Sequence, residues 1–360
     1  MPSRKHKYST QGLRTIRLVR AFSVGIAFGF ALLVNLSPLS VAQAQDQTSQ
    51  IGAKEIAFYG YSDCIALENE SVRVVVCPAA GGRILEYSLN GKNVLYLPAG
   101  DEGWVWDGSD ARGPMHAGRF DIGPEQVVPP RQVLWQGRWK GEITGDREVK
   151  LTSEVAKEAG VYLEREFHLD AVGSRLTCTQ TIISDSEKPV EYCHWSRTFA
   201  TGNGICVVPV SQPQRFSEGW VRYDAGRLLN MKPVDSHVER RGDYLVVSDR
   251  PEKPKLGFDS MSGWLAYFAP NDLLFIKTYP THPDRPYNEV AALTASIWYP
   301  GDGKVEVEPI GPRERLEKRG DRASFTETWY LREQVFPSID QVEPQRLTTL
   351  VESLQIRTVE

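Results

Sequence analysis

The stretch "ESVRVVVCP", residues 70–78, shows the pattern that decides the fold. Val72, Val74 and Val76 alternate with other side chains, so all three point to one face of an extended chain. The same alternation recurs in later segments, "RLTCTQTII" at 175–183, "GWLAYFAP" at 263–270 and "DLLFIKTYP" at 272–280. This period is typical of β-strands and differs from the period of helices, which is about 3.6 residues.

Turn signals separate these segments. They are "NGKN" at 90–93, "PAGDEG" at 98–103, "TGNG" at 201–204 and "PGDG" at 300–303. Strands at this spacing, without helices between them, predict an antiparallel all-β architecture. We expect a single large domain of two sheets, with apolar faces buried between them. The charged, proline-punctuated segment 235–255 leaves open a boundary between two sandwiches.

One segment near the end of the chain has a helical pattern. "PQRLTTLVESLQ", residues 344–355, brings Leu347, Leu350, Val351 and Leu354 to one side of a helix. The sequence therefore predicts a β-sandwich domain at 56–335 and a C-terminal helical tail at 336–360.

The first 44 residues have the features of a secretory signal peptide. A basic leader precedes an apolar run at 21–36, and Ala42-Gln43-Ala44 forms a small-residue cleavage site. The apolar run is shorter than the roughly 20 residues that a membrane-spanning helix needs. We expect secretion or export to the periplasm, cleavage near Ala44, a flexible mature N-terminus at 45–55, and no membrane contact after cleavage.

The charge of the mature chain bears on its partners. The leader holds six of the 42 Lys and Arg residues and none of the 46 Asp and Glu residues, so its removal leaves a net charge of about −10. A chain this acidic, without a basic run, argues against nucleic acid or an anionic membrane as a partner. A neutral or cationic small molecule and a polysaccharide suit it equally well, and a monomer is expected.

The five cysteines are too few and too scattered to form a disulfide scaffold. No pair has the spacing of a zinc site, so most are expected to be small buried side chains. One bridge is open, with Cys64 to Cys77 the best candidate. No metal and no cofactor are predicted.

"VEYCHWSRTF", residues 190–199, raises the question of a catalytic imidazole. Alternation puts Cys193, Trp195 and Phe199 on one face, which resembles a core face. His194 falls on the other, more polar face. It is then either a solvent-facing residue or part of the lining of a cleft.

Two glutamates in "GDGKVEVEPIGP", residues 301–312, are candidates for proton transfer. Val305 and Val307 are expected to face the core, which leaves Glu306 and Glu308 together on the opposite face. Two carboxylates on one face suit a site that needs a general base. An exposed strand made soluble by glutamates explains the pattern equally well.

Further polar and aromatic residues could contact a ligand. Arg83 follows the Gly81-Gly82 pair and could donate to a sugar hydroxyl or pair with an acid. Arg119 and Asp121 lie in "MHAGRFDIGPE", 115–125, which reads as a Gly/Pro-rich loop. Trp195 and Trp298 could stack on a sugar ring or belong to the core.

Three patches of the sequence resemble the galactose mutarotase-like superfamily, which contains the aldose 1-epimerases. They are "NESVRVVVCPAAGGRILEYSLNGKNVLY" at 69–96, "VEYCHWSRTF" at 190–199 and "VEVEPIGPRERLEKRGDRASFTETWYL" at 305–331. Their order along the chain matches that of the superfamily, and the best match is to an uncharacterised exported branch. The resemblance implies a β-supersandwich with a concave, sugar-sized cleft and a carbohydrate ligand.

In the enzymatic relatives, a histidine protonates the ring oxygen while a glutamate removes the proton of the anomeric hydroxyl. Carried over by motif, His194 would be the acid and Glu308 the base, and Arg83 would contact the substrate. Arg119, Asp121, Trp195, Glu306 and Trp298 complete the expected binding site. This assignment requires His194 and Glu308 to meet across one cleft, about 5 to 8 Å apart.

Three functions remain open from the sequence. The first is an exported sugar-ring isomerase, and the second is a carbohydrate-binding protein without turnover. The third is an accessory module in glycan degradation. Hydrolysis by Glu306 and Glu308 is disfavoured, because retaining sites place two carboxyls about 5 to 5.5 Å apart across a bond, usually from different strands.

Overall fold

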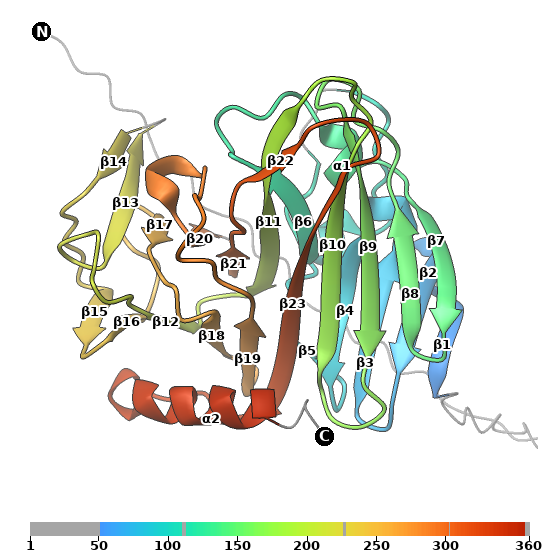
Figure 1. The fold of residues 1–360 in the computed structure, drawn as a ribbon. Coiled ribbons are helices and arrows are strands. Elements are labelled where there is room, and N and C mark those ends of the chain that lie inside the picture. The colour runs from blue at the N-terminus through green and yellow to red at the C-terminus, as the bar shows by residue number, and fades with distance from the viewer. Residues whose placement is uncertain (1–50, 110–112, 226–227, 302, 357–360) are drawn as a thin grey trace, which may run out of the picture. The chain divides into compact units, whose positions relative to one another are not determined.

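Two antiparallel sheets face each other in the computed structural model, which describes residues 51–109, 113–225, 228–301 and 303–356 (Figure 1). These residues belong to one compact unit, so the predicted single two-sheet domain is confirmed and no boundary falls at 235–255. The predicted leader and cleavage site at 1–44 lie outside the described residues.

The larger sheet has thirteen strands among the described residues. Its order is β1 (Gly52–Phe58), β2 (Tyr61–Glu68), β3 (Val72–Cys77), β4 (Arg83–Leu89), β6 (Gly118–Gly123), β11 (Val190–Thr201), β21 (Lys304–Pro309), β20 (Ala295–Gly301), β17 (Lys255–Phe258), β13 (Trp220–Ala225) and β14 (Leu228–Asn230). Two short strands join it at the side, β5 (Lys92–Asn93) on β4 and β22 (Glu314–Leu316) on β11.

The smaller sheet has ten strands in the described part of the chain. Its order is β15 (Val238–Arg241), β16 (Tyr244–Val247), β12 (Ile205–Pro209), β18 (Trp264–Ala269), β19 (Leu273–Thr278), β23 (Arg322–Glu333), β10 (Leu176–Ser184), β9 (Val161–Leu169), β8 (Glu148–Thr152) and β7 (Lys140–Gly145). The described helices are α1 (Gln132–Trp135), α2 (Pro344–Ile356) and four short 3₁₀ turns at Pro78–Ala80, Ala99–Asp101, Val290–Ala292 and Ile339–Gln341.

The main core lies between the sheets and is made by the alternating apolar side chains. Val72, Val74 and Val76 of β3 belong to it, as the sequence predicted, and so do Val305 and Val307 of β21. The predicted C-terminal helix is confirmed as α2. Its Leu347 and Val351 pack with Trp264 and Ile276 of the smaller sheet in a separate apolar cluster. Figure 1 shows α2 running past the ends of β18 and β19.

Two local predictions differ from the structure. Strand β1 begins at Gly52 and pairs with β2, so four residues of the segment expected to be flexible, 52–55, are part of the sheet. Gly118–Gly123 forms the central strand β6 instead of a loop. Glycine and proline at both ends of this segment suggested a loop, but the residues between them pair along their full length with β11.

All five cysteines are buried and have free thiols. Cys64 directly precedes and Cys77 directly follows the paired residues Ile65 and Val76 of β2 and β3. The two thiols are therefore cross-strand neighbours, and a hydrogen bond to Cys77, followed by burial, raises the pKa of the Cys64 thiol. Cys64 and Cys77, the best candidates for a disulfide in the sequence, are thus adjacent in the fold but not bridged.

Candidate functional site

Three neighbouring strands in the middle of the larger sheet carry the candidate site. Strand β11 lies between β6 and β21. Its register places Arg197 opposite Arg119 of β6 and Phe199 opposite Glu306 of β21. Two residues along each strand from the second pair, Arg197 contacts Glu308. Residues that oppose each other across antiparallel strands point to the same side. These charged groups therefore share the outer face of the sheet, away from the core between the sheets.

His194 points to the other face of the same strand. Its ring stacks on Phe325 of β23 in the opposite sheet, with centroids 5.6 Å apart, and the side chain is buried between the sheets. Burial lowers the pKa of His194 to about 3, so the imidazole is neutral near pH 7. The predicted meeting of His194 and Glu308 across one cleft is wrong, because the two side chains lie on opposite faces of the larger sheet.

The error has a physical cause. Both faces of β11 are buried, since Trp195 and His194 are both almost fully covered. Alternation correctly separated the two sets of side chains but could not say which set faces the second sheet. Trp195, Cys193 and Ile310 belong to an apolar cluster on the outer face, and the more polar set faces inward.

Arg197 is the centre of a buried ion-pair network. Its Nε lies 3.1 Å from Glu306 Oε1 and 3.2 Å from Glu308 Oε1, and its Nη1 lies 3.5 Å from Glu125 Oε1. Arg119 Nη2 approaches the same Glu306 oxygen at 3.6 Å. Lys255 Nζ, at the start of β17, lies 2.7 Å from Glu125 Oε2.

The two glutamates of β21 have opposite pKa shifts. Burial first, and then the charge of Glu306, raises the pKa of Glu308 to about 8. Burial also acts to raise the pKa of Glu306, but Arg197 and Arg119 outweigh it and lower the pKa. Near neutral pH, Glu308 is therefore mostly protonated and Glu306 is the ionised partner of the arginines.

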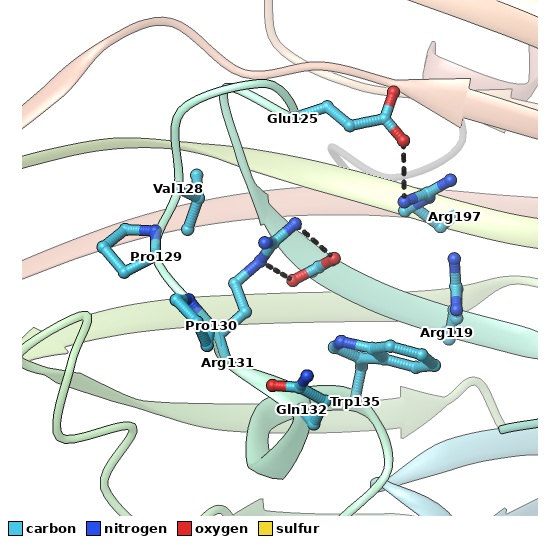
Figure 2. A pocket seen from close by; sticks show the side chains of 10 residues that line it. Arg119, Glu125, Val128, Pro129, Pro130, Arg131, Gln132, Trp135 and Arg197 are labelled. Atoms are coloured by element: carbon cyan, nitrogen blue, oxygen red, sulfur yellow. Dashed lines mark hydrogen bonds and ion pairs between the residues drawn. The ribbon is translucent and has the colours of Figure 1, made fainter. Parts of the chain in front are cut away.

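A cavity of about 410 Å³ opens above this network. It is bordered by side chains from β6, β11, α1 and the loop before α1, namely Arg119, Asp121, Glu125, Val128, Pro129, Pro130, Arg131, Gln132, Trp135 and Arg197. Figure 2 shows Arg119 and Arg197 together at one side of the cavity, with the Trp135 ring beside Arg119. The Arg119 guanidinium lies 4.8 Å from the Trp135 ring centroid.

The acidic groups that border the cavity are already paired. Arg131 binds both oxygens of Asp121, with Nε at 2.8 Å from Oδ1 and Nη2 at 3.0 Å from Oδ2. Burial acts to raise the pKa of Glu125, but Lys255 and Arg197 outweigh it and lower the pKa to about 2. Glu125 is thus ionised near neutral pH, and its oxygens can accept hydrogen bonds from a ligand.

The other predicted site residues divide into two groups. Arg119, Asp121 and Glu306 lie at the cavity or in the network below it. Trp298 lies opposite Glu306 in the register, and Trp195 packs under the Arg197 guanidinium, 5.2 Å from it. Neither tryptophan borders the cavity.

Arg83 is not among the residues that line the cavity. It is fully buried, and its guanidinium donates to the carbonyl oxygens of Pro114, at 3.0 Å, and Trp135, at 3.2 Å. Both partners are backbone groups, so Arg83 fixes the chain segments at each side of β6. The predicted substrate contact of Arg83 is wrong.

Sequence reasoning missed Arg131, Trp135 and Arg197. Arg197 had a signal, since it shares the face of Trp195 two residues away, but that face was assigned to the core. The other two come from a loop and a single-turn helix. Only the tertiary fold brings them to β6 and β11.

Among the described residues, no group of three or more His, Cys, Asp or Glu side chains is arranged to hold a metal ion. Within the same part of the chain, no helix is both long enough and apolar enough to cross a membrane.

The sequence matches no protein-family model and no curated protein. Solved structures do resemble the fold. A galactose mutarotase-like protein from Lactobacillus casei has a TM-score of 0.51 and 12% identity, over 75% of this chain and 100% of that chain. A galactose mutarotase-like protein from Clostridium acetobutylicum has a TM-score of 0.53 and 9% identity, over 79% of this chain and 99% of that chain. The fold is therefore galactose mutarotase-like, as the resemblance predicted.

Proposed function

We propose that the protein binds a carbohydrate in the cavity beside Arg119, Trp135 and Arg197. The observation that carries the proposal is the lining of this cavity. Its volume of about 410 Å³ is large enough for a small molecule, since such sites measure roughly 300 to 1,000 Å³. A sugar hydroxyl both donates and accepts hydrogen bonds, so a wall of guanidinium donors and carboxylate acceptors with one aromatic ring suits a sugar.

Binding without turnover is the reading that the geometry favours. A general acid or base must come within hydrogen-bond reach of the reacting atom. Glu308 has the pKa of such a group, but it is fully buried and does not border the cavity. Asp121 and Glu125 do border it, yet each is held by a cation. His194 lies behind the sheet.

Interconversion of sugar anomers is the second candidate, and the raised pKa of Glu308 favours it. A carboxyl group that titrates at about pH 8 can both give and take a proton near neutral pH. Arg197 borders the cavity and pairs with Glu308, so this ion pair would have to open for the carboxyl to reach a substrate. This candidate therefore requires a change in the Arg197 ion pairs.

The test is a calorimetric titration with a panel of mono- and disaccharides, using Trp135→Ala and, as a matched control, Trp106→Ala. Trp106 is a partly exposed tryptophan that does not border the cavity. We expect at least one sugar to bind, Trp135→Ala to weaken it about tenfold or more, and Trp106→Ala to leave it unchanged. If no sugar in the panel binds, or both variants behave alike, the cavity is not a carbohydrate site.

The same samples separate binding from turnover. Anomer exchange is followed by NMR for the wild type and for Glu308→Gln. Exchange no faster than in buffer supports binding alone, whereas exchange that disappears in Glu308→Gln supports the isomerase.

We also propose that the protein is exported. The support is the sequence alone, namely the basic leader, the apolar run at 21–36 and the site at Ala44.

A further inference from the structure

We infer that the carbohydrate bound in this cavity is an acidic sugar, whose single carboxylate is held at Arg119. The inference rests on the proposed function and names the class of its ligand.

Arg119 is a buried cation whose hydrogen bonds are incomplete. Only 1% of the residue is exposed, and its guanidinium lies against the rings of Trp135 and Phe199, at 4.8 Å and 5.7 Å from their centroids. Among the residues that the structure describes, its Nε and Nη1 atoms have no hydrogen-bond partner. Buried donors without a partner are costly, and a charged donor more so. Arg119 also borders the cavity, so a ligand there approaches the guanidinium that lacks these acceptors.

The charge around Arg119 is unbalanced. Within the described part of the chain, Glu306 is its one carboxylate neighbour within ion-pair distance, at 3.6 Å, and that carboxylate is shared with Arg197 at 3.1 Å. Glu308 is mostly protonated near neutral pH, so the two arginines have one ionised partner on β21. One positive charge is left over at this side of the cavity.

The other charged groups that border the cavity are paired with one another or with Lys255. Arg131 and Asp121 form a two-bond pair of their own. Glu125 is bound by Lys255 at 2.7 Å and lies 3.5 Å from Arg197 Nη1, on the far side of the network from Arg119. Glu289 accepts the Glu125 backbone N–H at 2.9 Å and does not border the cavity.

The size of the surplus decides between two anionic ligands. A sugar carboxylate carries one negative charge and would balance it. A phosphate monoester carries about −1.5 to −2 near pH 7, which would leave an uncompensated negative charge in a partly buried site. The expected chemistry is therefore that of a uronic acid and not that of a sugar phosphate, although the mature chain as a whole is acidic.

The test compares sugars that differ only in the charged group. Calorimetry is run with D-galacturonate and D-glucuronate, their neutral parents D-galactose and D-glucose, the methyl esters of the two uronates, and the two hexose 6-phosphates. We expect a uronate to bind about tenfold or more tightly than its neutral parent, its methyl ester and the phosphate. Raising the salt concentration should reduce this preference.

Two variants of Arg119 and a surface control complete the test. Arg119→Gln should bring the affinity for the uronate within about twofold of that for its neutral parent, and Arg119→Lys should retain part of the preference. Arg315→Gln removes an exposed arginine on β22 and should leave both affinities unchanged. Circular dichroism melts show whether Arg119→Gln folds, and Arg119→Lys carries the test if it does not.

The outcomes separate this inference from the proposed function. A neutral sugar or a phosphate that binds as tightly as the uronate overturns the acidic ligand while leaving the carbohydrate site intact. The same holds if the Arg119 variants keep the full preference. If none of the eight sugars binds, the carbohydrate site itself fails, and the inference fails with it.

Discussion

Arg197 of β11 and Glu308 of β21 stand side by side on the outer face of the larger sheet, with Nε and Oε1 3.2 Å apart. Glu306 lies two residues before Glu308 on the same face and binds the same guanidinium. Burial and mutual repulsion disfavour the state in which both carboxyls are ionised. Near neutral pH, Glu306 is therefore charged and Glu308 holds a proton. The site thus contains two chemically different glutamates at adjacent positions of one face.

The two glutamates should respond differently to the same substitution. Glu306→Gln removes the ionised partner of two buried arginines and should lower the free energy of unfolding by about 3–5 kcal/mol. Glu308→Gln replaces a mostly neutral carboxyl by a neutral amide of the same shape and should cost about 1 kcal/mol. Urea denaturation at pH 7 measures both, and equal losses for the two variants would contradict the assigned protonation.

The stability of the fold should decrease between about pH 7 and pH 8 because of Glu308. Its pKa is raised from 4.5 to about 8, so in this range the folded chain holds a proton that the unfolded chain has lost. The stabilisation is fully present below about pH 4.5 and is lost as the pH rises through 8, with a slope of up to about 1.4 kcal/mol per pH unit.

The buried histidines act in a lower range of pH. Burial lowers the pKa of His116 to about 2 and that of His194 to about 3, so both destabilise the fold mainly as the pH falls below about 6.5. Burial also raises the pKa of the Cys178, Cys193 and Cys206 thiols, which add to the slope near pH 8 in the wild type and in Glu308→Gln alike. The difference between the two proteins at pH 7, 7.5 and 8 therefore isolates the carboxyl. The slope should flatten in Glu308→Gln, and an identical slope in the variant would assign the effect to another group.

His194 should matter for stability and not for ligand binding. His194→Ala leaves a gap against Phe325 between the sheets and should lower the free energy of unfolding by roughly 1–3 kcal/mol. Because the imidazole does not border the cavity, the affinity for a bound sugar should stay within about twofold of the wild type. A variant that folds normally but loses sugar binding would place His194 in the site after all.

The alternation of side chains was enough to predict the fold but not the site. The alternating valines predicted both the strands and the faces that point to the core, because the opposite face of each strand carries charged or mixed residues. These valines are Val72, Val74 and Val76 of β3 and Val305 and Val307 of β21. The resemblance of the three sequence patches then gave the fold class, which the solved structures match.

The prediction failed in β11, where the more apolar face points away from the second sheet. Trp195 and His194 are both almost fully buried, so the hydrophobicity of the two faces did not indicate which one meets the second sheet. Arg119 and Asp121 were found because charged residues in a glycine-bounded segment are conspicuous. Trp135 and Lys255 carry no such signal, since each joins the site only through tertiary contacts.

The proposed export predicts a definite mature protein. Cells that produce the chain with its own leader should release it, or hold it in the periplasm, with an intact mass that corresponds to cleavage near Ala44. Deleting the apolar run 21–36 should leave the full-length remainder in the cytoplasm. An uncleaved protein that stays in the cell in both cases would exclude the leader as a signal peptide.

The thiols should be protected by the fold and all be available once it is lost. Each of the five cysteines is buried, so the native protein should react only slowly with Ellman's reagent. In guanidinium chloride, five thiols should react per chain. A count of three would mean that one bridge has formed. The Cys64→Ser variant then tests the Cys64–Cys77 pair, because a count of four means that the bridge used Cys64 and a count of two means that it lies elsewhere.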